Sequence, residues 1–223
     1  MKKNVKNLGI YVLLLVLTGS MASCNSWLDL DPQNKQTSGS YWQKQKDVEA
    51  VLTSCYLRMR ECADDCFFRW GEVRGDGVAL GADAAADLKK IKELDILPEN
   101  SLNDWGKVYR VIGSANSVIK YAPEVFEKDP MFEEVVMRAY VAEAVFLRSL
   151  CYFYLVRTFG EVPFVTEPYV NDEVSFKKGK DTEAYVLEQI TADLLAHLPY
   201  AKPGHEYEID NKTRATRWAS FSL

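Results

Sequence analysis

The longest regular pattern in the chain lies between Phe132 and Thr158, where apolar side chains recur every three or four residues. This spacing places them on one wide stripe of an α-helix, because side chains on a strand alternate every second residue. The stripe comprises Val135, Val136, Ala139, Ala142, Phe146, Leu150, Phe153, Tyr154 and Phe159. Its width predicts packing on both flanks, with Glu143 and Arg148 on the solvent-facing side. Gly160 follows as the residue expected to end the helix.

Further segments carry the same helical period. They run from about Lys46 to Cys62, Asn103 to Tyr121, Thr182 to Leu198 and Thr213 to Leu223, with a short helix expected at 84–90. Pro123 is expected to stop the second of these, since proline lacks a backbone N–H and clashes with the preceding turn. Residues 161–166 are expected to be extended, and 167–180 and 204–213 to be loops. The pattern therefore predicts an all-α fold with long loops, in which helix pairs form a helical-repeat scaffold.

The N-terminal segment has the layout of a bacterial export signal. Lys2, Lys3 and Lys6 precede an apolar run from Ile10 to Leu17, which is too short to span a membrane. Small residues then lead to Cys24, in an arrangement that resembles a lipoprotein cleavage site, where the cysteine thiol receives a diacylglycerol. The alternative is an ordinary signal peptide that a cysteine follows by chance. No later stretch is expected to span a membrane.

These features divide the chain into a signal peptide at 1–23, a lipid anchor and tether at 24–45, and a helical domain at 46–223. Acyl chains on Cys24, palmitate among them, would hold the protein firmly at a membrane. The last helical pattern breaks off at Leu223 with apolar residues uncovered. We therefore expect the sequence to be a truncated piece of a longer protein, incomplete at its C-terminus.

Charge and motif content exclude several function classes. The chain holds 27 Lys and Arg against 32 Asp and Glu, so it lacks the basic stripe that nucleic-acid binding requires. Its two histidines, His197 and His205, do not have zinc-site spacing, and no phosphate-binding or dinucleotide-binding loop is present. No metal and no cofactor are therefore expected. The adjacent acidic pairs at 64–65 and 133–134 would point to different helix faces, so neither forms an acid/base pair and no enzyme is expected.

The remaining cysteines have two interpretations. Cys55, Cys62 and Cys66 are spaced by seven and four residues, which places them on one face of a continuous helix. They are either small buried hydrophobic residues or partners in a disulfide, which an oxidising compartment would permit. Cys151 lies within the longest apolar pattern and is expected in the core.

The irregular stretch from Ala63 to Pro98 is the candidate binding region. It is punctuated by glycines and reads as a long loop, and loops of this length in a compact domain often carry function. Aromatic rings can stack on sugar faces while charged groups bind the hydroxyls. The candidate ligand-binding residues on this basis are Phe67, Phe68, Trp70, Arg74 and Asp76, with Tyr207 a weaker one. The alternative is that these aromatics pack the loop onto the helices.

An ordered set of short motifs resembles the N-terminal region of the SusD/RagB family of outer-membrane nutrient-binding lipoproteins. After the lipobox cysteine come Leu28-Asp29 with Pro32, Tyr41-Trp42, Trp105-x-x-x-Tyr109-x-x-Ile112-x-x-Ala115-Asn116, Glu143-Ala144-x-x-Leu147-Arg148-x-x-x-Tyr152-x-x-Leu155, Phe159-Gly160-x-Val162-Pro163, Ile190-x-x-Asp193-Leu194 with Leu198-Pro199, and Arg214-Ala215-Thr216. Each motif is short, but their order is specific. The resemblance covers nearly all of the chain after the signal peptide.

The resemblance implies a tetratricopeptide-like scaffold, although no tetratricopeptide signature is visible in the residues themselves. It also implies a lipid-anchored protein at the cell surface that caps a SusC-like TonB-dependent transporter and hands it glycans or peptides without catalysing a reaction. The motif residues implied to be structural, through helix packing and buried hydrogen bonds, are Trp105, Tyr109, Asn116, Arg148 and Tyr152.

Several hypotheses on function follow. The first is a surface lipoprotein that binds a glycan or oligosaccharide, with a peptide as the other ligand class, and assists its import through the outer membrane. The second is a helical module that only docks on a partner protein, or a fragment without ligand binding. An extracytoplasmic hydrolase is the third, and the sequence offers no catalytic motif for it.

Overall fold

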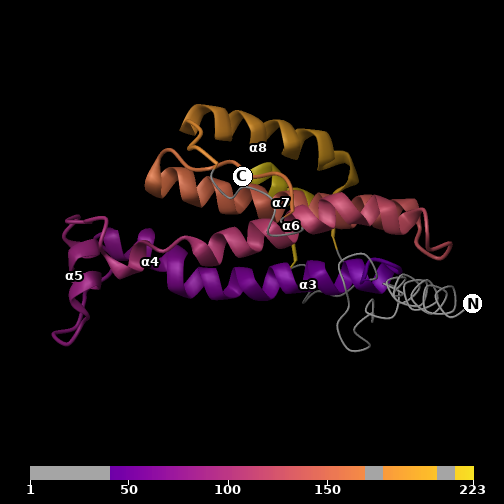
Figure 1. Cartoon of the computed structure of the whole chain (residues 1–223). Coiled ribbons are helices and arrows are strands. Elements are labelled where there is room, and N and C mark those ends of the chain that lie inside the picture. The colour runs from indigo at the N-terminus through magenta and orange to yellow at the C-terminus, as the bar shows by residue number, and fades with distance from the viewer. Residues whose placement is uncertain (1–40, 169–177, 205–213) are drawn as a thin grey trace, which may run out of the picture. The chain divides into compact units, whose positions relative to one another are not determined.

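A computed structural model describes residues 41–168, 178–204 and 214–223, which belong to one compact unit (Figure 1). The α-helices in these ranges are α3 (Gln45–Cys62), α4 (Phe68–Trp70), α5 (Ala86–Lys92), α6 (Gly106–Phe126), α7 (Glu134–Phe159), α8 (Glu183–His197) and α10 (Arg217–Ser222). Within the described ranges the only β pairing is an isolated antiparallel bridge between Val162 and Asp181. The all-α expectation is confirmed.

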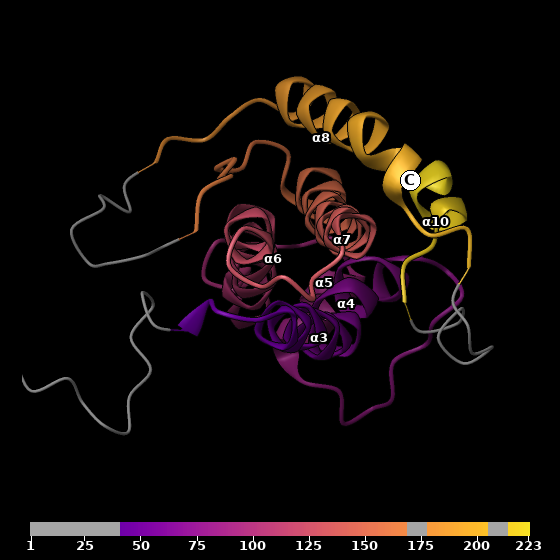
Figure 2. The same cartoon turned by 90° about the vertical axis from the view of Figure 1, so that its right-hand side faces the viewer.

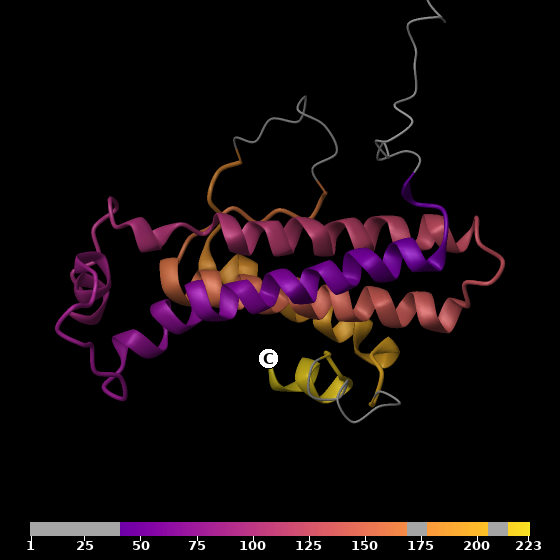
Figure 3. The same ribbon diagram turned by 90° about the horizontal axis from the view of Figure 1, so that it is seen from below.

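Helix α7 lies at the centre of the packing. It contacts α3, α6 and α8, and an end-on view shows α3, α6 and α7 as a triangle with α8 against the far side of α7 (Figure 2). Seen from below, α3 crosses between α6 and α7 (Figure 3). Small side chains allow this close approach, since Ala139, Ala142 and Ala144 on α7 are all buried. The predicted packing of α7 on both flanks is confirmed.

Two expectations about α7 were wrong. Glu143 and Arg148 are 2% and 5% exposed rather than solvent-facing, because each has a charged partner on another part of the chain. The helix is also long and apolar enough to cross a membrane by length and composition, contrary to the expectation that no later stretch is. Yet 78% of that apolar window is buried inside the protein. Its apolar character is therefore explained by its position in the core.

Helix α6 begins and ends later than predicted. It begins at Gly106 instead of Asn103, because Ser101–Asn103 form a separate 3₁₀ turn in which the Asn100 side chain accepts a hydrogen bond from the Leu102 N–H. It continues through Pro123 to Phe126, so Pro123 does not stop it. A proline near the end of a helix removes a single donor, and the Pro123 carbonyl still accepts a hydrogen bond from the Glu127 N–H at 3.2 Å.

The stretch after α3 is helical where a loop was expected. Ala63–Phe67 form a π-helical turn, and α4 follows without a break. The extra residue in such a turn shifts the helical phase, so the apolar positions of 62–70 remain on the core side. Beyond Gly71 the chain is less regular, with a 3₁₀ turn at Glu72–Arg74 and then α5, which matches the short helix expected at 84–90.

The segment after α7 is extended, as predicted. Gly160 ends α7 with φ of +72°, a conformation that favours glycine, and its N–H donates to the Val156 carbonyl at 2.8 Å. The bridge between Val162 and Asp181 then holds the segment next to the start of α8, where the Thr182 side chain accepts a hydrogen bond from the Tyr185 N–H. Helix α10 begins at Arg217, later than the predicted Thr213.

The four described cysteines are buried thiols. Burial raises the pKa of Cys55 to about 12, and it also raises the pKa of Cys151. These environments match the interpretation of the cysteines as small hydrophobic core residues. The signal peptide, Cys24, most of the tether and Tyr207 lie outside the described residues.

Candidate functional site

An aromatic cluster joins α4 to the last turn of α7. The Phe67 and Tyr154 rings are stacked with centroids 4.0 Å apart, and Phe159 meets the rings of Trp70 and Trp105 edge-on at 4.9 Å and 5.2 Å. The Trp70 indole N–H donates to the Leu102 carbonyl at 2.8 Å. These contacts hold the Trp70 ring in one orientation, since Phe67 and Phe159 pack against it and its single donor is engaged.

The structure separates the sequence candidates into two groups. Phe67 and Trp70 are 9% and 4% exposed, whereas Phe68 is 47% exposed and Arg74 and Asp76 lie at the surface. For Phe67 and Trp70 this burial agrees with the alternative interpretation, in which the aromatics pack this segment onto the helices. Trp70 and Arg74 nevertheless meet at one pocket, whose lining does not include the other three candidates.

This pocket, which we call the Trp70 pocket, has a volume of about 330 Å³. Its lining comes from α4, α5, α7 and the turns between them, and consists of Trp70, Arg74, Ile91, Ile96, Pro98, Asn103, Thr158 and Phe159. Apolar and aromatic walls with a few polar groups are typical of small-ligand sites. Sequence reasoning missed most of this lining, because Thr158 and Phe159 belong to a helix more than fifty positions away and nothing in the local sequence pairs them with Trp70.

The rim of the Trp70 pocket is held by backbone contacts. In the turn Glu72–Arg74, the Arg74 N–H donates to the Gly71 carbonyl and the Gly75 N–H donates to the Glu72 carbonyl. The Lys92 ammonium of α5 donates to the Gly75 carbonyl at 2.5 Å. On the opposite side, the Asn103 amide donates to the Leu97 carbonyl at 2.8 Å. The turn that carries Arg74 is therefore fixed relative to α5.

A larger hollow of about 590 Å³ lies between the start of α7 and the Leu198–Tyr200 turn, and reaches Arg217. Its lining includes Tyr200, but the Arg138 guanidinium lies over that ring at 4.7 Å and pairs with Glu134 at 2.6 Å. The Tyr200 ring and the Arg138 charge are therefore both engaged within the protein. This hollow therefore offers less to a polar ligand than the Trp70 pocket does.

A third hollow of about 500 Å³ lies beside the end of α3 and includes the acidic pair at 64–65 in its lining. Asp65 is paired there with Lys107 and with Arg69, the latter at 3.3 Å. The hydrogen bond from Lys107 is the main reason that the pKa of Asp65 falls below its usual value. An ionised, doubly paired carboxylate is a poor general acid, so the pair at 64–65 does not suggest catalysis.

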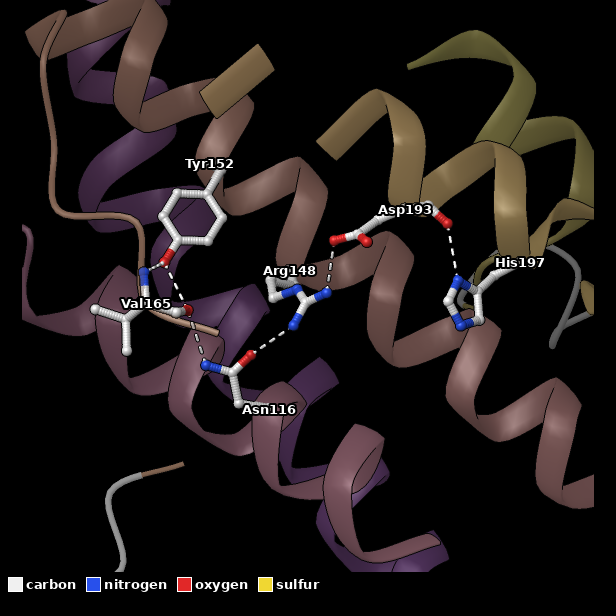
Figure 4. Close-up of polar contacts among 6 residues, drawn as sticks. All are labelled: Asn116, Arg148, Tyr152, Val165, Asp193 and His197. Atoms are coloured by element: carbon white, nitrogen blue, oxygen red, sulfur yellow. Dashed lines mark hydrogen bonds and ion pairs between the residues drawn. The ribbon is translucent and has the colours of Figure 1, made fainter. Parts of the chain in front are cut away.

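A buried polar network fixes the extended segment after α7 (Figure 4). The Tyr152 hydroxyl accepts a hydrogen bond from the Val165 N–H at 2.7 Å and donates to the Val165 carbonyl at 2.9 Å. Asn116 donates to the same carbonyl and accepts from Arg148, both at 2.9 Å. Arg148 also pairs with Asp193 of α8 at 2.8 Å. The network thus connects α6, α7 and α8 to one strap of backbone.

The other motif residues behave in the same way. The Tyr109 hydroxyl donates to the Pro163 carbonyl at 2.7 Å, and the Trp105 ring packs on Phe159. The implied structural role of the motif residues in helix packing and buried hydrogen bonding is therefore confirmed. Because the polar groups of these residues form hydrogen bonds within the protein, we assign them to stabilisation of the fold and not to ligand binding.

A second buried cluster holds the segment before α10. The Glu143 carboxylate receives hydrogen bonds from two nitrogens of the Arg214 guanidinium, at 2.9 to 3.1 Å, and one from the Tyr56 hydroxyl at 2.9 Å. The Ala215 N–H donates to the same hydroxyl at 2.8 Å. Burial beside this carboxylate raises the pKa of Tyr56. The cluster explains why a charged residue sits in the middle of α7.

Comparison with known proteins assigns these features to a family. Residues 26–223 match a SusD-like family model described as "Starch-binding associating with outer membrane". The chain is 26% identical to SusD-like protein P38 of Formosa agariphila, with 86% of this chain and 37% of that protein covered. It is 25% identical to the starch-binding protein SusD of Bacteroides thetaiotaomicron, with the same two coverages. The chain thus spans about two-fifths of the length of these curated relatives.

Solved structures share the fold. A crystal structure of a SusD superfamily protein from Bacteroides thetaiotaomicron matches with a TM-score of 0.71 and 23% identity, over 81% of this chain and 42% of that one. A laminarin-binding SusD-like protein matches with a TM-score of 0.66 and 22% identity, over 80% of this chain and 38% of that one. At this identity the likeness concerns the fold alone.

Proposed function

This chain belongs to the SusD-like family, and from that membership we propose that it binds a glycan or oligosaccharide at the cell surface and assists its import. The importer would be a SusC-like TonB-dependent transporter of the outer membrane, to which Cys24 would keep the protein close through its lipid. The protein would bind its ligand without transforming it. The names of two relatives, a starch-binding SusD and a laminarin-binding protein, support a saccharide over a peptide.

The observation that carries the ligand proposal is the composition of the Trp70 pocket. Two aromatic rings, Trp70 and Phe159, lie in its wall together with hydrogen-bonding groups of Arg74, Asn103 and Thr158. The C–H face of a sugar ring is apolar and packs on an aromatic face, while its hydroxyls require polar partners. The pocket lining offers both kinds of contact and contains no carboxylate that could serve as a general acid or base.

A blocked pocket tests the ligand proposal. Ile96 lines the Trp70 pocket and is 38% exposed, so Ile96→Trp would fill the pocket without emptying the core. The neighbouring Leu97 is 46% exposed and does not line it, so Leu97→Trp is the matched control. We expect titration calorimetry against a panel of soluble glycans to find a binder whose affinity falls at least tenfold in Ile96→Trp and is retained in Leu97→Trp.

Two results would overturn the ligand proposal. One is the absence of binding by the unmodified protein to every glycan of the panel. The other is equal affinity of both tryptophan variants for the glycan that binds, because the ligand would then occupy a different surface. Thermal unfolding of each variant, measured in parallel, separates loss of the pocket from loss of the fold.

The anchor and the transporter are tested separately. Mass spectrometry of the protein isolated from its own membranes should show acyl chains on Cys24, and Cys24→Ser should release the protein from the membrane fraction. Affinity purification from the outer membrane should retain a TonB-dependent barrel. An unacylated Cys24, or purification without a barrel, would contradict the corresponding part of the proposal.

A further inference from the structure

We propose that the Trp70 pocket recognises the anionic group of an acidic saccharide, a carboxylate or a sulfate ester, through Arg74. This inference rests on the proposed function and narrows its substrate class. It begins from the charges in the lining, where Arg74 is the one ionisable side chain. A pocket with one cation and no anion favours a ligand that brings the opposite charge.

The absence of carboxylates from the lining contrasts with the surrounding sequence. The stretch 70–105 carries Glu72, Asp76, Asp83, Asp87, Glu93, Asp95, Glu99 and Asp104, and none of these eight lines the pocket. The fold therefore turns Arg74 toward the pocket and the neighbouring acids away from its lining. Charges outside the lining act through water, where salt largely screens interactions over distances greater than about 8–10 Å.

Arg74 also differs from five other cations near this end of α7. Arg69 and Lys107 pair with Asp65, Lys89 and Lys92 donate to backbone carbonyls, and Arg157 lies over the rings of Phe153 and Tyr154. The Arg74 side chain has no hydrogen bond, ion pair or ring contact within the described part of the chain, and only its backbone N–H is bonded. Its guanidinium is thus available to a ligand.

The chemistry of that guanidinium selects the ligand group. Its N–H donors are arranged in a planar fork that matches the two oxygens of a carboxylate, or two oxygens of a sulfate ester, and it accepts no hydrogen bond. Charge-assisted pairs of this kind are about twice as strong as neutral hydrogen bonds. A neutral saccharide would offer only hydroxyls to Arg74, so the pocket would discriminate against it.

The position of Arg74 is prepared for this contact. The 3₁₀ turn that carries it is closed by its own hydrogen bonds, and the Lys92 ammonium fixes the next residue, Gly75, to α5. The Trp70 ring beside it is fixed by its indole hydrogen bond. Binding therefore orders only the Arg74 side chain, which keeps the entropy cost of recognition low.

The test compares saccharides that differ in charge alone. The probes are a uronate hexasaccharide, its carboxyl-reduced neutral counterpart, and a sulfated form of that neutral hexasaccharide. Calorimetry should show at least tenfold tighter binding of the uronate or the sulfated probe than of the neutral one, and the preferred probe identifies the anionic group. Arg74→Gln should abolish this preference and Arg74→Lys should restore part of it. Asp76→Asn, at an exposed position outside the lining, should change affinity less than twofold.

The outcomes separate this inference from the function on which it rests. If the neutral probe binds as tightly as the charged ones and Ile96→Trp removes that binding, the pocket binds glycans and the anionic preference is refuted. If the preference survives in Arg74→Gln, the anion is recognised elsewhere and the role of Arg74 is refuted. If no saccharide binds, the glycan function and this inference both fall.

Discussion

Removal of the Tyr152 hydroxyl should show how much the buried network contributes to stability. The ring of Tyr152 is fully buried and would keep its packing on Phe164 in Tyr152→Phe. Two hydrogen bonds to Val165 would be lost, at 2.7 Å and 2.9 Å. The Val165 carbonyl would retain its bond from Asn116, but its N–H would lose the partner that it has in the structure.

The expected cost follows from these contacts. Each hydrogen bond contributes roughly 1 kcal/mol net, and an amide left without a partner in a partly buried position adds a fraction of its desolvation penalty. The sum is about 2–3 kcal/mol of unfolding free energy. For a chain of this size, that corresponds to a fall in Tm of about 4–12 °C.

Urea unfolding followed by circular dichroism would measure this change. The matched control is Tyr185→Phe, which removes a hydroxyl from a ring that is 45% exposed. The control should change stability by less than about 0.5 kcal/mol, as surface substitutions generally do. If Tyr152→Phe is as stable as the control, the strap of backbone after α7 is not held by this hydroxyl and the reasoning is refuted.

Three further predictions concern other parts of the fold. Gly160→Ala should destabilise the protein by about 1–2 kcal/mol because residue 160 has a positive φ. Gly113→Ala, inside α6, should stabilise it by about 0.5–1 kcal/mol. Thermal unfolding that shows the two variants shifting Tm in the same direction would contradict this. Hydrogen bonds from backbone N–H groups, chiefly that of Gln45, hold the pKa of Asp129 below 3.8. The ionised Asp129 carboxylate should therefore stabilise the fold above pH 3.8, and this stabilisation should be lost as the pH falls through the folded-state pKa. Asp129→Asn should therefore lower the urea midpoint at pH 7, and the difference between the two proteins should shrink as the pH falls below 3.8. Burial and a pKa of about 12 should leave Cys55 unreactive toward iodoacetamide until the protein unfolds, as mass spectrometry would show.

Local periodicity predicted the helices well, because an amphipathic pattern depends on residues close in sequence. It failed where long-range contacts override the local pattern. A charged residue on a helix is ordinarily assigned to solvent, yet Glu143 is buried because Arg214 meets it from 71 positions away. Such a pairing leaves no trace within the local pattern.

The boundary errors have local causes. The π-helical turn at Ala63–Phe67 inserts a residue and shifts the phase, which made the continuous helical path to Trp70 resemble a loop. Of the candidate site, Trp70 and Arg74 were named from residue type alone. The rest of the lining, which includes Ile91 and Phe159, could not be predicted, because only the tertiary fold brings these residues next to Trp70.

The contact between Arg214 and Glu143 also constrains the order in which the protein can fold. Tyr56 and Ala215, which share the cluster, are 159 positions apart, so the cluster closes one of the longest loops in the chain. Helices α3, α6 and α7 can assemble on local contacts before that loop closes, and until then the Glu143 carboxylate stays without its cation. Because a buried carboxylate without its cation is costly, we expect full burial of Glu143 to require that Arg214 has joined it.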